Sequence, residues 1–451
     1  MTQLGEAVAR YHKLLESEAF RDLSWVSELR DAMQSRGLVL SGRPISPFLR
    51  PHLVPKRQHE QLAKASASLF SAINRMKKTA LTNPQLLARM ELLPAEKMLA
   101  LTDPGYSELT AMSTLEASLN QGSLHFLNYG AMAPAGIVYT DILSELFYDC
   151  APMKEFRKKH KLAKSLGLKH MLNATLKAWK EFGGKSKPQI AILETKTPFP
   201  TVDSNEHVLL AEYLRKAGYL AEVMSPEQLE YKGGVLRRGD FVINLVLRRI
   251  SAQDFVIRYD LNQPLVRAYR ERAVCLVNSF RAEIAQKRAI FDLITDDSLT
   301  AKFPAVERKA IRDFIPWTRV VRAGETDWRG ETVDLMEYIV ANRANLVLRP
   351  NDENAEHPSY DGALMDAASW ERALKTTVRT PYVVQEATPE TTTPFPVQLY
   401  GGLEMKEMRV DMYSHAYLGK VQCASTYLAP AGPSGFSSVQ GVVPTFLLEG
   451  R

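Results

Sequence analysis

The sequence predicts an α/β protein, and three observations support this fold class. Over the first 120 residues, apolar side chains recur mainly at helical spacing, as in 3–18. Beyond residue 184, short apolar runs of strand type alternate with amphipathic helical segments. In the last third, four more strand-like runs lie among two further helical patterns. We therefore expect mixed sheets that are covered by helices.

Composition agrees with a folded protein of several domains. The chain has 451 residues, of which 45% are hydrophobic and 24% are charged, and this excludes a disordered or fibrous chain. Lysine and arginine total 57 against 51 acidic residues, so the net charge is +6. Over this length the bias is too small to indicate nucleic-acid binding by itself.

The cysteines and the apolar segments predict the compartment. Cys150, Cys275 and Cys423 lie far apart in a chain too long to need disulfides, so we expect reduced thiols. Residues 1–15 carry charges throughout and lack the apolar core of a secretory signal. No run approaches the roughly 18 apolar residues that cross a bilayer. We therefore expect a soluble, cytoplasmic protein without membrane contact.

The first third predicts helices around one strand. Helical spacing is found over 3–18, 58–76, 83–92 and 137–147, with proline-rich breaks at 41–55 and 101–105 and a strand at 123–129. Residues 154–170 are strongly basic. They suit a helix with a solvated face, and a nucleic-acid-binding helix is the alternative.

The middle and last thirds predict two sheet regions. After a Gly-rich linker at 183–188, strands at 189–193, 219–224 and 241–247 and a helix at 206–217 indicate a small Rossmann-like sheet. No GxGxxG sequence is present, so a dinucleotide site is not expected. Further on, we predict helices at 333–342 and 366–377 and strands at 346–348, 382–385, 408–412 and 420–426.

Residues 345–362, NLVLRPNDENAEHPSYDG, carry the most informative chemistry. An apolar strand ends at Arg349 and is followed by Asp352 and Glu353, and a second strand ends at Gln385 and Glu386. A cation at a strand end can hold a phosphate, and a nearby carboxylate can hold Mg²⁺. The alternative is a pair of ordinary strands with solvated ends.

A set of ordered segments resembles the circularly permuted ATP-grasp proteins, which include glutathionylspermidine synthase and eukaryotic glutathione synthetase. They occur along nearly the whole chain, at 41–44 with 49–51, 126–136, 226–231, 277–281 with Lys287, 315–319, 346–353, 381–386 and 443–447. The resemblance implies an ATP-grasp-like fold with an inserted Rossmann-like domain. Its implied domains are a helical region at 1–183 that contributes to the ATP-grasp core, a Rossmann-like domain at 184–275 and a nucleotide-binding region at 276–451.

The resemblance also implies a chemistry, the ligation of a carboxylate to an amine through an acyl phosphate, with ATP and Mg²⁺ as cofactors. Arg349 falls at the phosphate-binding lysine of the family, and Glu353 falls at a metal-binding acid. For the nucleotide, the matching positions are Gln385, Glu386, Lys287 and Arg281. The pair Arg248 and Arg249 falls where relatives place a cation for a substrate carboxylate, and a surface arginine pair is the alternative.

Other positions depart from the family. The family sequence Glu-Tyr-Asn-Ala-Glu-Ser-Pro-Ala-Gly is replaced by one with Asn128, Gly130 and Met132 in place of acid, amide and acid. Only Asn128 stays as a possible metal ligand. The lid at 354–360 contains Glu356 and Pro358 instead of glycines, although glycine lets backbone N–H groups approach phosphates. The loop at 429–436 keeps two glycines and has no asparagine.

These matches and departures predict a ligase-like protein whose activity is weak, changed or lost. Its expected partners are a small-molecule or peptide-like carboxylate and an amine. The alternative is a non-catalytic ligand-binding or scaffolding protein that works with an active ligase. Nucleic-acid binding through 154–169 is a third, less favoured hypothesis. Among nine histidines no two have metal-ligand spacing, so a zinc site is not expected.

Overall fold

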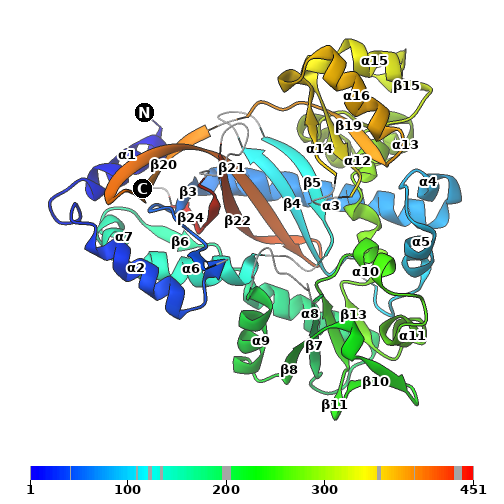
Figure 1. Cartoon of the computed structure of the whole chain (residues 1–451), viewed down its shortest axis with the longest axis horizontal. Helices are drawn as coiled ribbons and strands as arrows, with labels where there is room; N and C mark the ends of the chain where they lie inside the picture. Colours follow the sequence, from blue (N-terminus) through cyan, green and yellow to red (C-terminus); the bar gives the residue numbers. More distant parts are fainter. Residues whose placement is uncertain are drawn as a thin grey trace.

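The fold is built around a central antiparallel sheet (Figure 1). Around it lie the helices that cover one of its faces, a Rossmann-like region, a second antiparallel sheet and a small three-stranded sheet. The computed structural model describes residues 2–40, 42–107, 110–119, 124–132, 136–195, 205–352, 357–390, 392–430 and 439–449. Within these residues no helix combines the length and the apolar character that a membrane span requires.

The central sheet joins strands from the first and the last third of the chain. Its order is β23-β22-β21-β4-β5, and β20 pairs with the outer part of β21. The strands are β4 (Met112–Leu119), β5 (Leu124–Gly130), β20 (Thr392–Leu399), β21 (Gly402–Tyr417), β22 (Lys420–Pro430) and β23 (Gly441–Val443). The mainly helical prediction for the first 120 residues missed β4. The side chains of β4 alternate between two faces of the sheet. This alternation identifies a strand only when its partner strands are known.

One face of the central sheet is apolar and carries the largest core. Leu115 and Phe126 lie on this face, as does Met412, and they pack against α3 (Lys56–Thr82), α12 (Ala289–Ile294) and α14 (Ala305–Phe314). Figure 1 shows α3 running along the sheet. Because successive strand residues point to opposite faces, burial of this face leaves the alternate, largely polar residues on the other.

The Rossmann-like region is a parallel sheet in the order β13-β12-β7-β8. Its strands are β7 (Ile190–Leu193), β8 (Ala221–Met224), β12 (Leu245–Arg248) and β13 (Cys275–Val277), with helices α8 (Leu168–Phe182), α9 (Glu206–Lys216), α10 (Ala252–Arg258) and α11 (Pro264–Arg270). The single strand predicted at 241–247 is wrong. Asn244 interrupts it by accepting a hydrogen bond from the Gln189 backbone at 3.0 Å. The first part becomes β11 (Phe241–Val242), in an antiparallel sheet with β9 (Glu230–Lys232) and β10 (Val235–Arg238).

A second antiparallel sheet, β14-β19-β17-β18, lies at the upper right of Figure 1. It consists of β14 (Thr318–Val320), β17 (Leu346–Pro350), β18 (Tyr360–Asp361) and β19 (Tyr382–Glu386). Leu346 and Leu348 pack against α15 (Leu335–Ala341) and α16 (Ala367–Thr377). Val347 and Arg349 alternate with them and therefore face away from these helices.

The two chain ends meet in a small sheet, β3-β24-β6, of β3 (His52–Pro55), β24 (Thr445–Leu448) and β6 (Leu162–Lys164). Helices α1 (Gln3–Leu15), α2 (Ser24–Ser35), α6 (Ile137–Asp149) and α7 (Ala151–Arg157) surround it (Figure 1). The remaining elements are β1 (Val39–Leu40), β2 (Arg43–Pro44), α4 (Pro84–Ala88), α5 (Pro94–Leu101), η1 (Pro226–Gln228), η2 (Phe280–Gln286), α13 (Asp297–Thr300), β15 (Glu325–Trp328), β16 (Glu331–Asp334), η3 (Arg343–Asn345) and η4 (Gly362–Leu364).

The basic segment 154–170 is not one helix, so both forms of that prediction are wrong about its structure. It contains the end of α7, the strand β6 and the start of α8. Lys158 pairs with Glu155 at 2.5 Å, and Lys161 pairs with Glu449 at 2.7 Å. Because the segment is divided among three elements, its lysine and arginine side chains do not lie on one face of a helix.

Candidate functional site

The polar face of the central sheet carries polar and charged side chains that line two cavities. Thr114 and Glu116 alternate along β4, and across the strand pair their register partners on β5 are Gly130 and Asn128. On the other side, Glu116 is opposite Tyr413 of β21. Because register partners share a face, one surface carries the side chains of Thr114, Glu116, Asn128, Asp411, Tyr413, His415 and Ser425.

Two neighbouring cavities open over this surface. The charged cleft, of about 470 Å³, lies between the central sheet and the second sheet, and its charged side chains are Glu116, Arg349, Asp361, Glu390, Arg409 and Asp411. The neutral pocket, of about 410 Å³, lies farther along the same surface, and its polar lining includes Thr114, Asn128, Gln286, Tyr413, His415 and Ser425. The two cavities share strands β4 and β21, so a ligand bound in one lies next to the other.

Arg349 lies in the wall of the charged cleft. The Nε atom of its guanidinium is buried and has no hydrogen-bond partner among the described residues. Burial lowers the pKa of Arg349 from its usual value, and the positive charges of Arg288 and Arg409 act in the same direction. Glu116 and Asp361 oppose this shift only in part. The loss of hydration at Arg349 is therefore only partly offset by its carboxylate neighbours.

The second cation of the cleft is held by carboxylates. Arg409 donates from Nε to Asp411 at 3.0 Å and from Nη2 to the other oxygen of Asp411 at 3.0 Å. Its Nη1 lies 3.3 Å from Glu390. This bidentate pairing fixes Arg409 on the sheet. The cleft thus contains four carboxylates and two guanidinium groups.

Strand β19 leads directly into the cleft, because residues 387–390 after it are part of the lining. The side chain of Gln385 is completely buried, donates to Thr318 Oγ1 at 3.1 Å, and has an amide oxygen without a partner among the described residues. Glu386 accepts a hydrogen bond from Arg329 at 2.9 Å. Residues 387–390 can therefore offer backbone groups to a ligand in the cleft, whereas neither Gln385 nor Glu386 is part of its lining. Glu386 is the register partner of Leu346 and lies on the face that packs against the helices.

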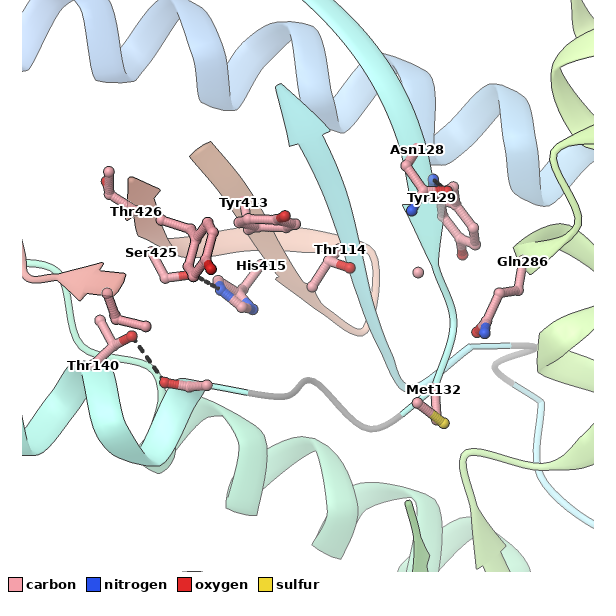
Figure 2. A pocket seen from close by; sticks show the side chains of 14 residues that line it. Thr114, Asn128, Tyr129, Met132, Thr140, Gln286, Tyr413, His415, Ser425 and Thr426 are labelled. Carbon is pink, nitrogen blue, oxygen red and sulfur yellow. Dashed lines mark hydrogen bonds between the residues drawn. The ribbon is translucent and has the colours of Figure 1, made fainter. Parts of the chain in front are cut away.

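The neutral pocket centres on a buried histidine (Figure 2). His415 is 1% exposed, and its Nε2 lies 2.7 Å from Ser425 Oγ. The ring atom Nδ1 is buried without a partner among the described residues. Burial lowers the pKa of His415 to about 4, so the imidazole is uncharged at neutral pH. Asn128, on the opposite side of the pocket in Figure 2, accepts a hydrogen bond from the backbone of Tyr129 at 3.0 Å.

Two residues predicted to bind the nucleotide lie away from the cleft lining. Lys287 is buried, with its Nζ 2.9 Å from Glu96 and 2.6 Å from Asp352. Arg281 donates to the backbone oxygens of residues 100 and 101 at 3.1 and 2.8 Å. Both cations hold α5 against the segment that follows the Rossmann-like sheet. Their role toward a nucleotide stays a prediction.

The predicted substrate cations lie at the end of β12. Arg248 is completely buried, forms an ion pair with Glu283, and donates to the backbone oxygens of residues 278 and 279 at 3.2 and 3.3 Å. Arg249 forms ion pairs with Glu206 at 2.9 Å and with Glu194 at 3.3 Å. Both guanidinium groups already have carboxylate partners, and neither is part of the lining of the two cavities.

Some predicted features lie outside the described residues. These are Glu353, the first part of the lid at 354–356, residues 133–135, and most of the loop at 429–436. Among the residues that are described, no group of three or more His, Cys, Asp or Glu side chains is arranged to hold a metal ion. Arg349 and Asn128 do lie over one sheet surface, but in different cavities.

Sequence reasoning missed Glu116, Arg409, Asp411, His415 and Ser425. The available signal was polar alternation, as in residues 114, 116 and 118 and in residues 411, 413 and 415. Alternation predicts a strand with one polar face. It does not say that four such strands lie side by side and pool their polar residues.

The structure is similar to several solved proteins. A glutathione synthetase-like effector from Globodera pallida, solved without ligand, matches with a TM-score of 0.60 and 14% identity, over 94% of this chain and 97% of that one. A putative gamma-glutamylcysteine synthetase from Methylobacillus flagellatus matches with a TM-score of 0.44 and 11% identity, over 88% and 89% of the two chains. An ATP-grasp RimK-domain protein from Sphaerobacter thermophilus matches with a TM-score of 0.30 and 16% identity, over 57% of this chain and 89% of that one. No family model and no curated protein sequence matches the chain.

The first of these matches covers almost the whole of both chains and identifies the fold. The chain therefore has a glutathione synthetase-like α/β fold, which confirms the α/β, glutathione synthetase-like fold class predicted from the sequence. At 14% identity the similarity concerns the fold alone, because one fold supports many functions.

Proposed function

We propose that the charged cleft binds the phosphates of ATP together with Mg²⁺, and that the protein has the chemistry of an ATP-dependent carboxylate–amine ligase with reduced turnover. The observation that carries this proposal is Arg349, a partly buried cation in the wall of a cleft between two sheets, whose buried Nε has no hydrogen-bond partner among the described residues.

Arg349 is suited to a phosphate. A guanidinium offers several N–H donors in one plane and binds phosphate oxygens in pairs. A phosphate would favour the charged form of Arg349, whose pKa is lowered first by burial and then by the positive charges of Arg288 and Arg409. The position, on β17 beside β19, also lets residues 387–390 after β19 contact the rest of a nucleotide.

The carboxylates of the cleft fit Mg²⁺ in part. Glu116 supplies the hard oxygen ligand that Mg²⁺ prefers, whereas both oxygens of Asp411 already pair with Arg409. The amide oxygen of Gln385, which has no partner among the described residues, lies on the same side of β19 as the cleft residue Val347. Mg²⁺ commonly uses one or two protein carboxylates and completes its shell with phosphate oxygens and water. Glu116 and Asn128, register partners on one face, are the residues we expect to hold it. When bound, Mg²⁺ would neutralise charge on the phosphates.

The reduced turnover follows from the neutral residues beside Glu116. Asn128, Gly130 and Met132 provide no carboxylate, so any metal here is held by fewer charges than the resemblance implies. Each lost charged ligand removes several kcal/mol of transition-state stabilisation in sites of this kind, to an order of magnitude. The residues of this chain would still bind and orient the reactants. They would stabilise the charge of the transition state less than a site with carboxylates at these positions.

A thermal unfolding titration with Mg-ATP tests the binding site. Ligand at 100 times its Kd should stabilise the native state by about 2.7 kcal/mol. Arg349→Met should abolish this stabilisation without lowering the stability of the free protein, because burial already disfavours the charge. Arg237→Met, at an exposed arginine of β10, is the matched control and should behave as the unmodified chain. An equal shift in Arg349→Met, or no shift at millimolar Mg-ATP, contradicts the proposal.

A non-catalytic binding protein is the second candidate, favoured by the lack of a three-ligand metal cluster in the described chain. ADP release in the presence of a panel of acids and amines separates the two. Release that requires both an acid and an amine identifies a ligase. Binding of Mg-ATP without any such release identifies the non-catalytic protein.

A further inference from the structure

The neutral pocket differs in charge from the cleft beside it. Among its described lining residues there is no Asp, Glu, Lys or Arg. The charged cleft, by contrast, contains six charged side chains within a similar volume. The two cavities are separated by only two positions along a strand, since Thr114 lines the pocket and Glu116 lines the cleft. This abrupt change indicates that the two cavities select different parts of a ligand.

His415 shows that the neutral pocket has an unmet hydrogen-bonding capacity. The side chain is 99% buried, Nε2 is engaged with Ser425 Oγ, and Nδ1 lacks a partner among the described residues. Figure 2 shows the ring among Ser425, Tyr413 and Thr114, on the sheet surface that lines the pocket. A neutral imidazole has one donor and one acceptor nitrogen, and Ser425 can either accept or donate. Nδ1 can therefore serve a ligand donor or a ligand acceptor.

A charged group would be poorly accommodated in this pocket. An ion moved from water into a site without a counter-charge loses hydration that no partner replaces. A carboxamide or peptide bond loses much less and offers both an N–H and a C=O. Gln286 also lines the pocket with an uncharged amide, whose oxygen accepts a hydrogen bond from the Ala131 backbone at 3.2 Å.

We propose that the neutral pocket binds an uncharged, amide-bearing part of the ligand and discriminates against a carboxylate or ammonium at that position. The volume of about 410 Å³ suits a group of peptide-residue size. Taking this ligand as the ligation substrate rests on the proposed function. The selectivity of the pocket does not depend on nucleotide binding. The reacting carboxylate or amine would then lie toward Glu116, at the cleft side of the pocket.

The test compares two probes of similar shape, N-acetylphenylalaninamide and N-acetylphenylalanine. They differ in the terminal group, which is an uncharged carboxamide with N–H donors in the first and a carboxylate in the second. Ligand-observed NMR titrations are carried out at pH 7 on the full chain without nucleotide. We expect the amide to bind at least about tenfold more tightly than the acid. Equal affinity, preference for the acid, or no binding of the amide up to its solubility would each overturn the inference.

Three variants locate the binding. His415→Phe keeps a ring and removes both nitrogens, and should weaken the amide about fivefold. If His415→Phe does not fold, Ser425→Ala tests the His415–Ser425 hydrogen bond with a smaller change. Met132→Lys adds a cation at a partly exposed pocket position and should raise affinity for the acid. Arg237→Met is the control. An unchanged amide affinity in both His415→Phe and Ser425→Ala overturns the assignment of this site.

The test of the neutral pocket and the test of Mg-ATP binding can fail independently. Amide selectivity without Mg-ATP binding refutes the nucleotide site and supports the pocket. Mg-ATP binding that is lost in Arg349→Met, together with no amide selectivity, supports the nucleotide site and overturns the pocket.

Discussion

Restoring a carboxylate and an amide beside Glu116 tests the proposed metal site most directly. The change is Asn128→Glu together with Gly130→Asn on β5. Their register partners on β4 are Glu116 and Thr114, so both new side chains would project over the polar sheet surface. The structure adds a third substitution. A Cβ on Gly130 would lie 2.4 Å from Thr114 Oγ1, and such overpacking costs about 1–3 kcal/mol. Thr114→Ala removes the clashing atom.

The substitutions have two expected effects on free energy, a small loss of stability without metal and a gain in ATP binding with Mg²⁺. Without metal, the new carboxylate lies directly across from Glu116, and a cross-strand pair of like charges costs about 0.2–1 kcal/mol. With Mg²⁺, the same two carboxylates become ligands, and their repulsion is replaced by attraction to the ion. We expect the triple variant to be slightly less stable alone and to bind ATP at least about tenfold more tightly in the presence of Mg²⁺, a gain of about 1.4 kcal/mol.

Isothermal calorimetry with ATP, with and without Mg²⁺, measures this gain. The matched control replaces Asn128 by Gln in the same Thr114→Ala, Gly130→Asn background, and has the same size without the charge. An affinity that does not depend on Mg²⁺ in the triple variant, or an equal gain in the Gln control, would refute the assignment of this face to metal binding.

Three stability predictions follow from buried groups. Because burial lowers the pKa of His415 to about 4, the unfolded chain takes up its proton first, near pH 6.5. Stability should fall as pH drops between these values, by at most about 1.4 kcal/mol per pH unit from this group, as urea unfolding at several pH values would show. Arg248→Met should cost about 3–5 kcal/mol, because it leaves Glu283 buried without its partner, and adding Glu283→Gln should recover part of the loss. Gly362→Ala would place a Cβ 2.1 Å from the backbone oxygen of Arg343, so the backbone must move, and a denaturation curve should show a loss of more than about 1 kcal/mol.

Each of these has an internal control. His415→Phe should reduce the pH dependence of stability between pH 6.5 and 4, to which His12 and His52 also contribute because burial lowers their pKa values to about 4 and about 3. An unchanged slope would contradict the assignment. Asp141 acts in the opposite direction, since burial raises its pKa to about 6 and the folded chain takes up its proton first. Gly402→Ala meets its nearest atom at 3.8 Å and should lose little by overpacking. An equal loss at positions 362 and 402 would contradict the steric argument.

Periodicity in the sequence was sufficient for elements that carry their own pattern. The helix α1, the buried strand β7 and the strands β17 and β19 lie close to their predicted ranges, because each has an apolar face or run that is visible locally. Two of the failures share one physical cause. Strand β4 and the break at Asn244 depend on partner strands, and these come from elsewhere in the chain.

The candidate site divides in the same way. Arg349 could be found from the sequence because a cation at the end of an apolar strand is a local signal, and the structure places it in the charged cleft. Arg248 and Lys287 carry the same charge, but the structure pairs them with Glu283 and Glu96. Sequence alone gives the charge of a side chain and not its partner.

The sequence by itself determined the α/β class, the positions of those helices and strands that carry a local apolar pattern, and the identity of the cations and neutral residues at key positions. Only the tertiary structure decided which of them share a cavity. Antiparallel pairing of β4 with β21 brings together residues almost 300 positions apart. Strand register then selects which alternate residues face the ligand, and burial sets the charge of His415. These are properties of pairing and solvent exclusion, which no local pattern contains.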